Sequence, residues 1–290
     1  MILRALAISA VFAITIFVVA FGVGLYVRRN GIFFPEPFPE GLWDTSAFSH
    51  KPVDEWFEAE DGIRLHGWLF RSDAADPPLM IWYHGNAGNI THRAAVADIL
   101  AGRGIDVFLF DYRGFGKSEG SPTEKNVYLD AVAAWRHATS NIASEGSPVV
   151  LYGESIGGAY AAFVASKHPP RCVIIENSFA SLHSIARVHY HPLPVGLLAS
   201  DGLNTLEWLN QADVPVLVMH GKRDKVAPFE LGIELYEGLD SPKDLFVSET
   251  ADHSAIPWIE GKRYFDRVTR FVEENTQPAI LAETGVRSAD

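Results

Sequence analysis

Short apolar runs alternate with longer stretches of helical periodicity through most of the chain. An apolar run bounded by turn residues is typical of a strand buried on both faces, as in a parallel sheet covered by helices. The predicted strands are Leu79–Tyr83, Ile105–Phe110, Val149–Tyr152, Cys172–Ile175, Val216–Met219 and Leu245–Val247. The predicted helices lie near 91–102, 124–139, 156–167, 203–211, 229–238 and 257–275.

A β-hairpin precedes this alternation. Glu55–Ala59 and Ile63–Phe70 flank Asp61-Gly62, a dipeptide that favours a tight turn. Residues 53–275 are therefore expected to form one α/β domain: a mostly parallel sheet with an N-terminal antiparallel hairpin and helices on both faces. The stretch from Ile175 to Val216 is too short for a large lid, so we expect a short cap.

The N-terminus carries a membrane signal. Ala5 to Val27 contains no charged residue, and a helix of that length spans the roughly 30 Å of bilayer hydrocarbon. A cleaved signal peptide is the alternative, but its apolar core is shorter and a small-residue cleavage site follows it. We expect residues 1–30 to form an uncleaved single-pass anchor. Arg28 and Arg29 after the span, against Arg4 before it, favour a cytoplasmic catalytic domain.

Two other segments lie outside the predicted domain. Residues 31–52 contain Pro35, Pro37 and Pro39, a spacing that excludes a helix and predicts an extended linker. The stretch 276–290 lacks periodicity, and we expect a disordered tail there.

Composition excludes several classes of partner. The formal net charge of −12 argues against a nucleic-acid partner, because phosphate binding needs clustered Lys and Arg. A single cysteine, Cys172, cannot form an internal disulfide. His183, His189 and His191 lack accompanying cysteine or paired carboxylate ligands, so we expect no metal. Composition does not indicate an oligomeric state.

The candidate nucleophile is Ser155, in Gly153-Glu154-Ser155-Ile156-Gly157. A predicted strand comes directly before this G-x-S-x-G sequence and a helix rich in small residues directly after, which is the context of a nucleophile elbow. The turn needs Gly153 and Gly157 because a Cβ beside the serine would collide with the neighbouring strand or helix. It would hold the hydroxyl at a helix N-terminus, where backbone N–H groups can stabilise an oxyanion.

A second small-residue loop follows the strand Leu79–Tyr83. It reads His84-Gly85-Asn86-Ala87-Gly88-Asn89, and such a loop supplies half of an oxyanion hole. We expect the backbone N–H groups of Asn86 and Ile156 to be the two donors. Small residues such as Gly85 let the backbone approach a substrate closely. We assign His84 a structural role, bonding loop carbonyls.

Asp224 and His253 complete a candidate triad. Each follows a predicted strand, and open α/β sheets place their sites beyond the C-terminal ends of strands. His253 would take the Ser155 proton, and Asp224 would orient the imidazole and stabilise its cation. The chain order Ser, Asp, His is the one found in α/β hydrolases. Asp252 is an alternative acid, but it adjoins His253 in sequence and would usually point elsewhere.

The loop that begins at Asp111 imitates a nucleotide site. Gly116-Lys117-Ser118 matches the end of a Walker A motif, which would also need glycine at position 111. We therefore reject nucleotide binding, expect no cofactor, and predict that this loop shapes the wall of the site.

Together these motifs resemble the BEM-type, ABHD-like family of membrane-anchored α/β hydrolases. The resemblance rests on four segments: His84–Asn89, Asp111–Ser118, Gly153–Gly158 and Glu176-Asn177-Ser178-Phe179. It implies an α/β-hydrolase fold and a triad at Ser155, Asp224 and His253. It also implies hydrolysis of acyl esters or thioesters, since some relatives remove fatty acyl groups from proteins or lipids.

Three functions are compatible with these residues. The first is a serine hydrolase that cleaves carboxylic esters or thioesters through an acyl-enzyme, with a lipid-like or acyl substrate near a membrane. The second is a serine peptidase of the proline-iminopeptidase type, which shares the triad but usually has a larger cap. The third is a non-catalytic binding protein on the same fold, which an intact triad disfavours.

Overall fold

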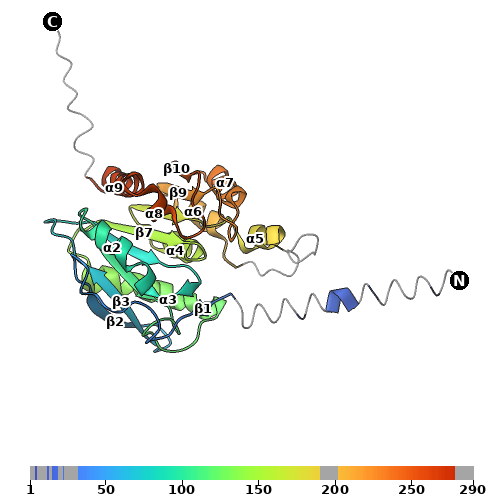
Figure 1. The fold of residues 1–290 in the computed structure, drawn as a ribbon, viewed down its shortest axis with the longest axis horizontal. Coiled ribbons are helices and arrows are strands. Elements are labelled where there is room, and N and C mark those ends of the chain that lie inside the picture. The colour runs from blue at the N-terminus through green and yellow to red at the C-terminus, as the bar shows by residue number, and fades with distance from the viewer. Residues whose placement is uncertain are drawn as a thin grey trace, which may run out of the picture.

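The computed structural model describes residues 32–189 and 202–277, together with positions 4, 12, 15–18 and 22. In that part of the chain one eight-stranded sheet has the order β10-β9-β8-β7-β4-β6-β3-β2 (Figure 1). The strands are β2 (Val53–Glu58), β3 (Arg64–Phe70), β4 (Leu79–Tyr83), β6 (Asp106–Asp111), β7 (Val149–Glu154), β8 (Cys172–Glu176), β9 (Val216–Gly221) and β10 (Lys243–Ser248).

The direction of the strands confirms the predicted mixed sheet. β2 and β3 form an antiparallel hairpin, and β3 is antiparallel to β6. From β6 through β4, β7, β8 and β9 to β10 every neighbouring pair is parallel. The carboxyl ends of these parallel strands therefore meet at one edge of the sheet, where loops from distant parts of the sequence can build a site.

Helices cover both faces of the sheet, as predicted. They are α2 (Ala94–Ala101), α3 (Glu124–His137), α4 (Gly157–Lys167), α5 (Leu182–His189), α6 (Thr205–Ala212), α7 (Phe229–Gly238), α8 (Ile256–Glu260) and α9 (Lys262–Thr276). Buried side chains of α3, α4, α6 and α7 share one apolar cluster with one set of alternate strand residues. Buried side chains of α2, α8 and α9 share a second cluster with the other set. The period-2 alternation of the strands explains this division.

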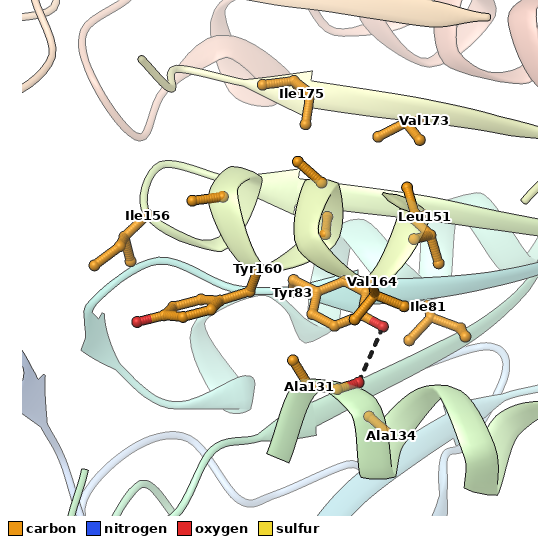
Figure 2. Close-up of a cluster of buried hydrophobic side chains, with 14 of the residues drawn as sticks. Ile81, Tyr83, Ala131, Ala134, Leu151, Ile156, Tyr160, Val164, Val173 and Ile175 are labelled. Atoms are coloured by element: carbon orange, nitrogen blue, oxygen red, sulfur yellow. Dashed lines mark hydrogen bonds between the residues drawn. The ribbon is translucent and has the colours of Figure 1, made fainter. Parts of the chain in front are cut away.

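Figure 2 shows part of the first cluster, which includes Ile156, the residue after the candidate nucleophile. Ile81, Leu151 and Val173 from three adjacent strands pack beneath α4, and the hydroxyl of Tyr83 donates to the Ala131 carbonyl at 3.3 Å. The Tyr83 hydroxyl is therefore buried with a hydrogen-bond partner, as most buried polar groups are. The turn between β7 and α4 therefore packs against a closely packed apolar cluster.

The helix boundaries differ from the predictions at three places. The predicted helix 257–275 is two helices, because Gly261 has a positive φ of 50° that no helix continues through. The predicted helix 91–102 is a 3₁₀ turn, Ile90–His92, followed by α2. We did not predict α5, which is amphipathic but only eight residues long.

The segment before the domain lies against it. β1 (Phe34–Pro35) pairs in parallel with β5 (Ala87–Gly88), and Pro37 bridges to Gly116. The Asn89 side-chain amide donates to the carbonyls of Glu36 and Glu40, both at 2.9 Å. Residues 32–43 therefore pack along the loop that we expect to supply an oxyanion-hole donor (Figure 1).

Three parts of the predicted organisation fall on residues that are not described. These are most of the predicted anchor (residues 1–30), residues 190–201 of the predicted cap, and residues 278–290 of the predicted tail. Within the described ranges, no helix has the length and apolar character to cross a membrane.

Candidate active site

Ser155 occupies a sharp turn between β7 and α4. Its φ is 55°, in the left-handed region that a residue with a side chain adopts at a cost of about 1 kcal/mol or more. The backbone N–H of Ser155 donates to the Glu176 carbonyl at 2.8 Å. A Cβ on Gly157 would lie 2.0 Å from the Tyr83 carbonyl oxygen, so the turn closes only with glycine there. The strand–turn–helix geometry is that of a nucleophile elbow.

The structure brings Ser155, His253 and Asp224 into one line of hydrogen bonds. His253 Nε2 lies 3.0 Å from Ser155 Oγ, and His253 Nδ1 lies 2.6 Å from Asp224 Oδ2. Asp252 is exposed and accepts from the Ser254 N–H at 3.3 Å, and no hydrogen bond among the described residues joins it to the imidazole. The geometry therefore selects Asp224 over Asp252 as the partner of His253.

Backbone donors hold the Asp224 carboxylate. Its Oδ1 accepts from the N–H groups of Val226 at 2.8 Å and Ala227 at 2.9 Å, which leaves Oδ2 for His253. The buried imidazole of His220 lies 3.6 Å from the same Oδ2. This arrangement fixes the orientation of the carboxylate without a second charged partner.

Asn177 connects the two loops that carry Asp224 and His253. Its side-chain amide donates to the His253 carbonyl at 2.7 Å, and its Oδ1 accepts from the Gly221 N–H at 3.0 Å. Asn177 has a φ of 48°, which asparagine tolerates better than most residues. The sequence pointed to Asn177 only through a family resemblance. Its position just after β8, at the edge where the site lies, was the signal for a supporting role.

The loop His84–Asn89 lies beside the elbow. His84 Nδ1 donates to the Gly85 carbonyl at 2.6 Å, in agreement with the predicted structural role. The Asn86 carbonyl accepts from the Phe34 N–H at 2.7 Å, and the Asn86 side chain donates to the Ile32 carbonyl at 2.7 Å. Among the hydrogen bonds of residues 32–189 and 202–277, none uses the backbone N–H of Asn86 or Ile156, so both are free to face a substrate oxygen.

A largely buried ion pair joins that loop to the elbow. Arg93 donates to Glu154 through Nη2 at 2.7 Å and Nε at 2.9 Å, and its Nη1 donates to the Ala87 carbonyl at 2.9 Å. Burial alone would raise the pKa of Glu154, but the attraction and hydrogen bonds of Arg93 outweigh it and lower that pKa to about 2. Glu154 is therefore ionised at neutral pH, and the pair fixes the loop relative to Ser155.

Glu176 lies opposite Glu154 in the β7–β8 register, but no arginine or lysine among the described residues pairs with it. Burial raises its pKa to about 7, even though the Tyr152 hydroxyl donates to Oε2 at 2.5 Å. The Tyr264 hydroxyl lies 2.7 Å from that of Tyr152 and extends the network to α9. Two neighbouring carboxyls thus have opposite pKa shifts because only one of them has an arginine.

The Asp111 loop supports its neighbours through its polar side chains. Asp111 Oδ1 accepts from the Ile90 N–H at 3.0 Å, at the end of the His84–Asn89 loop. Arg113 makes ion pairs with Asp61 and Asp130, both at 2.7 Å. These contacts tie the β2–β3 hairpin and α3 to this edge of the sheet.

The described residues contain no group of three or more His, Cys, Asp or Glu side chains that could hold a metal. His183 and His189 lie in α5, where His189 Nε2 donates to the Val226 carbonyl at 2.7 Å. His191 lies outside the described residues.

Known proteins are similar to this chain over nearly its whole length. A family model described as serine aminopeptidase, S33 (Hydrolase_4) matches residues 77–195. The chain is 33% identical to the uncharacterized protein Rv2307c of Mycobacterium tuberculosis, covering 97% of this chain and 98% of that protein. It is 27% identical to protein bem46 of Schizosaccharomyces pombe, covering 92% and 93%. The chain belongs to this family of α/β hydrolases, whose members include bem46.

Solved structures confirm the α/β-hydrolase fold predicted from the motifs. The esterase Pf2001 of Pyrococcus furiosus has a TM-score of 0.68 at 23% identity, covering 85% of this chain and 98% of that one. The esterase domain of a Rhodothermus marinus protein has a TM-score of 0.62 at 18% identity, covering 78% and 100%.

Removing the Glu176 carboxyl should flatten the dependence of stability on pH. The pKa of Glu176 is about 7 in the folded chain and 4.5 as an ordinary carboxyl. Between these values the unfolded chain releases a proton that the folded chain keeps, so the free energy of unfolding falls by about 3 kcal/mol as pH rises from 4.5 to 7. Urea denaturation at pH 5 and pH 8 should show a smaller fall for Glu176→Gln than for the parent. The exposed Glu273→Gln is the control, and equal falls in all three proteins would contradict this explanation.

Proposed function

We propose that the protein is a serine hydrolase that cleaves carboxylic esters or thioesters. The observation that carries the proposal is the line from Ser155 Oγ through His253 to Asp224 Oδ2, with successive distances of 3.0 Å and 2.6 Å. A serine hydroxyl in contact with an imidazole that a carboxylate orients is the arrangement that activates serine as a nucleophile. Its place on an elbow beside two free backbone N–H groups supports the same reading.

The reaction follows from these positions. His253 Nε2 takes the hydroxyl proton as Ser155 Oγ attacks the acyl carbon, and Asp224 stabilises the imidazolium. The N–H groups of Asn86 and Ile156 receive the oxyanion of the tetrahedral intermediate. The imidazolium returns the proton to the departing alcohol or thiol, which leaves an acyl group on Ser155. His253 then removes a proton from water as the water attacks the acyl-enzyme, and the imidazolium returns this proton to Ser155 Oγ as the acid leaves.

Ester and thioester substrates have support beyond the triad. Both structural neighbours compared above are named esterases. The family model carries the description of a serine aminopeptidase, and amide hydrolysis would use the same three side chains. We propose esters and thioesters rather than amides as substrates because an alcohol or thiol is a better leaving group than an amine.

Substitution of the nucleophile should abolish turnover. We expect Ser155→Ala to lower the kcat for a p-nitrophenyl ester by about 10⁴-fold and to eliminate labelling by a fluorophosphonate probe. Retained labelling would show that the nucleophile is another residue. The control is Ser178→Ala, which removes a hydroxyl that donates to the Ser155 carbonyl at 2.7 Å but leaves the nucleophile in place, so labelling should persist. A panel of acyl esters, acyl-CoA thioesters and aminoacyl amides extends the test, and faster cleavage of the amides would favour a peptidase.

The two neighbouring aspartates should behave differently. Asp224→Asn is expected to lower kcat by about 10⁴-fold, because the amide holds the imidazole in the wrong tautomer. Asp252→Asn should keep nearly full activity, since the Asp252 side chain accepts from the Ser254 N–H and forms no hydrogen bond with His253 among the described residues. Steady-state kinetics of both variants on one ester would decide the point, and the reverse order of losses would assign the acid to Asp252.

The membrane anchor is a separate part of the proposal. The apolar run Ala5–Val27 supports it, with the domain that follows on the cytoplasmic side. We expect the full chain to sediment with membranes through a carbonate wash. A chain that begins at Gly31 should remain in the supernatant and keep its esterase activity, because residues 32–43, which brace the His84–Asn89 loop, are retained. Release of the full chain by carbonate would exclude a spanning helix.

A further inference from the structure

The segment before the domain is bonded through its backbone to the edge of the sheet where the candidate site lies (Figure 1). Four backbone hydrogen bonds join it to the loops after β4 and β6: Phe34 N–H to the Asn86 carbonyl at 2.7 Å, Glu36 N–H to the Gly88 carbonyl at 3.0 Å, Phe38 N–H to the Gly116 carbonyl at 2.7 Å, and Gly116 N–H to the Glu36 carbonyl at 3.1 Å. The contact is thus a set of specific bonds to two loops of the site edge.

Asn86 is held at two points by this segment. Its carbonyl accepts from the Phe34 N–H at 2.7 Å, and its side-chain Nδ2 donates to the Ile32 carbonyl at 2.7 Å. The backbone N–H of Asn86 has no partner among the described residues, and it is the group that we propose as an oxyanion donor. The two bonds therefore fix the residue that carries the donor while the donor itself stays free.

The peptide group that carries this N–H lies next to the nucleophile. A Cβ placed on Gly85 would be 3.5 Å from Ser155 Cβ. The Gly85 carbonyl, at the other end of the same peptide group as the Asn86 N–H, accepts from His84 Nδ1 at 2.6 Å. An oxyanion donor acts only at about 2.7–3.1 Å from the oxygen that it stabilises, so a small displacement of Asn86 would weaken it.

The loop has few means of its own to stay in place. His84–Asn89 contains no apolar side chain larger than a methyl group, and that one, Ala87, is exposed. A segment with few buried apolar contacts opens readily unless hydrogen bonds hold it. The position of the loop therefore depends on bonds from neighbouring segments, and those to the carbonyl and side chain of Asn86 come from residues 32 and 34.

We infer that Ile32 and Phe34 are positioning residues of the oxyanion hole: their backbone groups hold Asn86 so that its N–H meets the tetrahedral intermediate. The inference rests on the proposed hydrolysis at Ser155 and adds residues that act on that reaction through Asn86. The segment that follows the predicted anchor is thus more than the extended linker expected from its prolines, because its bonds raise the rate constant of the chemical step.

The test compares an ester with its thionoester, phenyl butyrate with O-phenyl thionobutyrate, on the full-length protein in detergent. Sulfur accepts hydrogen bonds weakly, so an intact oxyanion hole favours the ester, whereas a loss of folded enzyme lowers both rates equally. Asn86→Ala keeps the backbone N–H but removes the bond to Ile32, and Phe34→Pro removes the donor to the Asn86 carbonyl. Each should lower kcat for the ester about tenfold with little change in KM, and should reduce the ester-to-thionoester ratio of kcat severalfold.

Two control variants keep both bonds to Asn86. Phe34→Ala removes an exposed ring but retains the N–H, and Asn210→Ala removes an asparagine whose amide donates to the Gly238 carbonyl at 3.0 Å. Both should keep the ratio of the parent protein. In the double variant Phe34→Pro/Asn86→Ala the loss should be smaller than the product of the two single losses, because both substitutions release the same residue.

An unchanged ratio in Asn86→Ala or in Phe34→Pro would overturn the inference and leave ester hydrolysis standing. A parent protein with no preference for the ester would also overturn it, since the N–H of Asn86 would then not receive the oxyanion. Failure of the parent to cleave the ester, together with absence of fluorophosphonate labelling, would overturn the proposed function and this inference with it.

Discussion

The left-handed backbone of Ser155 is the constraint on which the site depends. A serine at a φ of 55° is stable only if its neighbours hold the turn closed, and here the Tyr83 carbonyl lies where a side chain on Gly157 would be. β4 and β7 must therefore be adjacent, as they are in the sheet. The same adjacency places the loop after β4 beside the serine. One turn thus fixes both the nucleophile and the loop that carries the N–H group of Asn86.

The second half of the site depends on the other side of β7. β8 and β9 follow in order, and Asn177 at the end of β8 bonds to the loops that carry Asp224 and His253. Because parallel strands end at one edge, residues that lie 98 positions apart in sequence approach to 3.0 Å. The apolar clusters on both faces keep these strands in register, so the distances within the site follow from the packing of the sheet.

Sequence patterns predicted the sheet well because buried parallel strands are continuous apolar runs with few alternative interpretations. Strand ends moved by about two residues, since polar residues such as Asp111 and Glu154 continue a strand that the apolar pattern ends. The family motifs and chain order led to the three residues that the fold brings together. The sequence pattern did not show which of Asp224 and Asp252 contacts His253, because that contact depends on where the backbone of the loop turns. It also gave no sign that Glu36 and Asn89 would meet, since contacts between an extended segment and a loop leave no periodic signal.

Glu154 and Glu176 lie at the same edge of the sheet but in different electrostatic environments. The two carboxyls are register partners on adjacent strands, yet the pKa of Glu154 falls to about 2 beside Arg93 whereas burial raises that of Glu176 to about 7. The ionised Glu154 has a structural role, because it pairs with Arg93, which also donates to the Ala87 carbonyl. Within residues 32–189 and 202–277 no arginine or lysine pairs with Glu176, which accepts from the Tyr152 hydroxyl, so part of its burial cost is uncompensated.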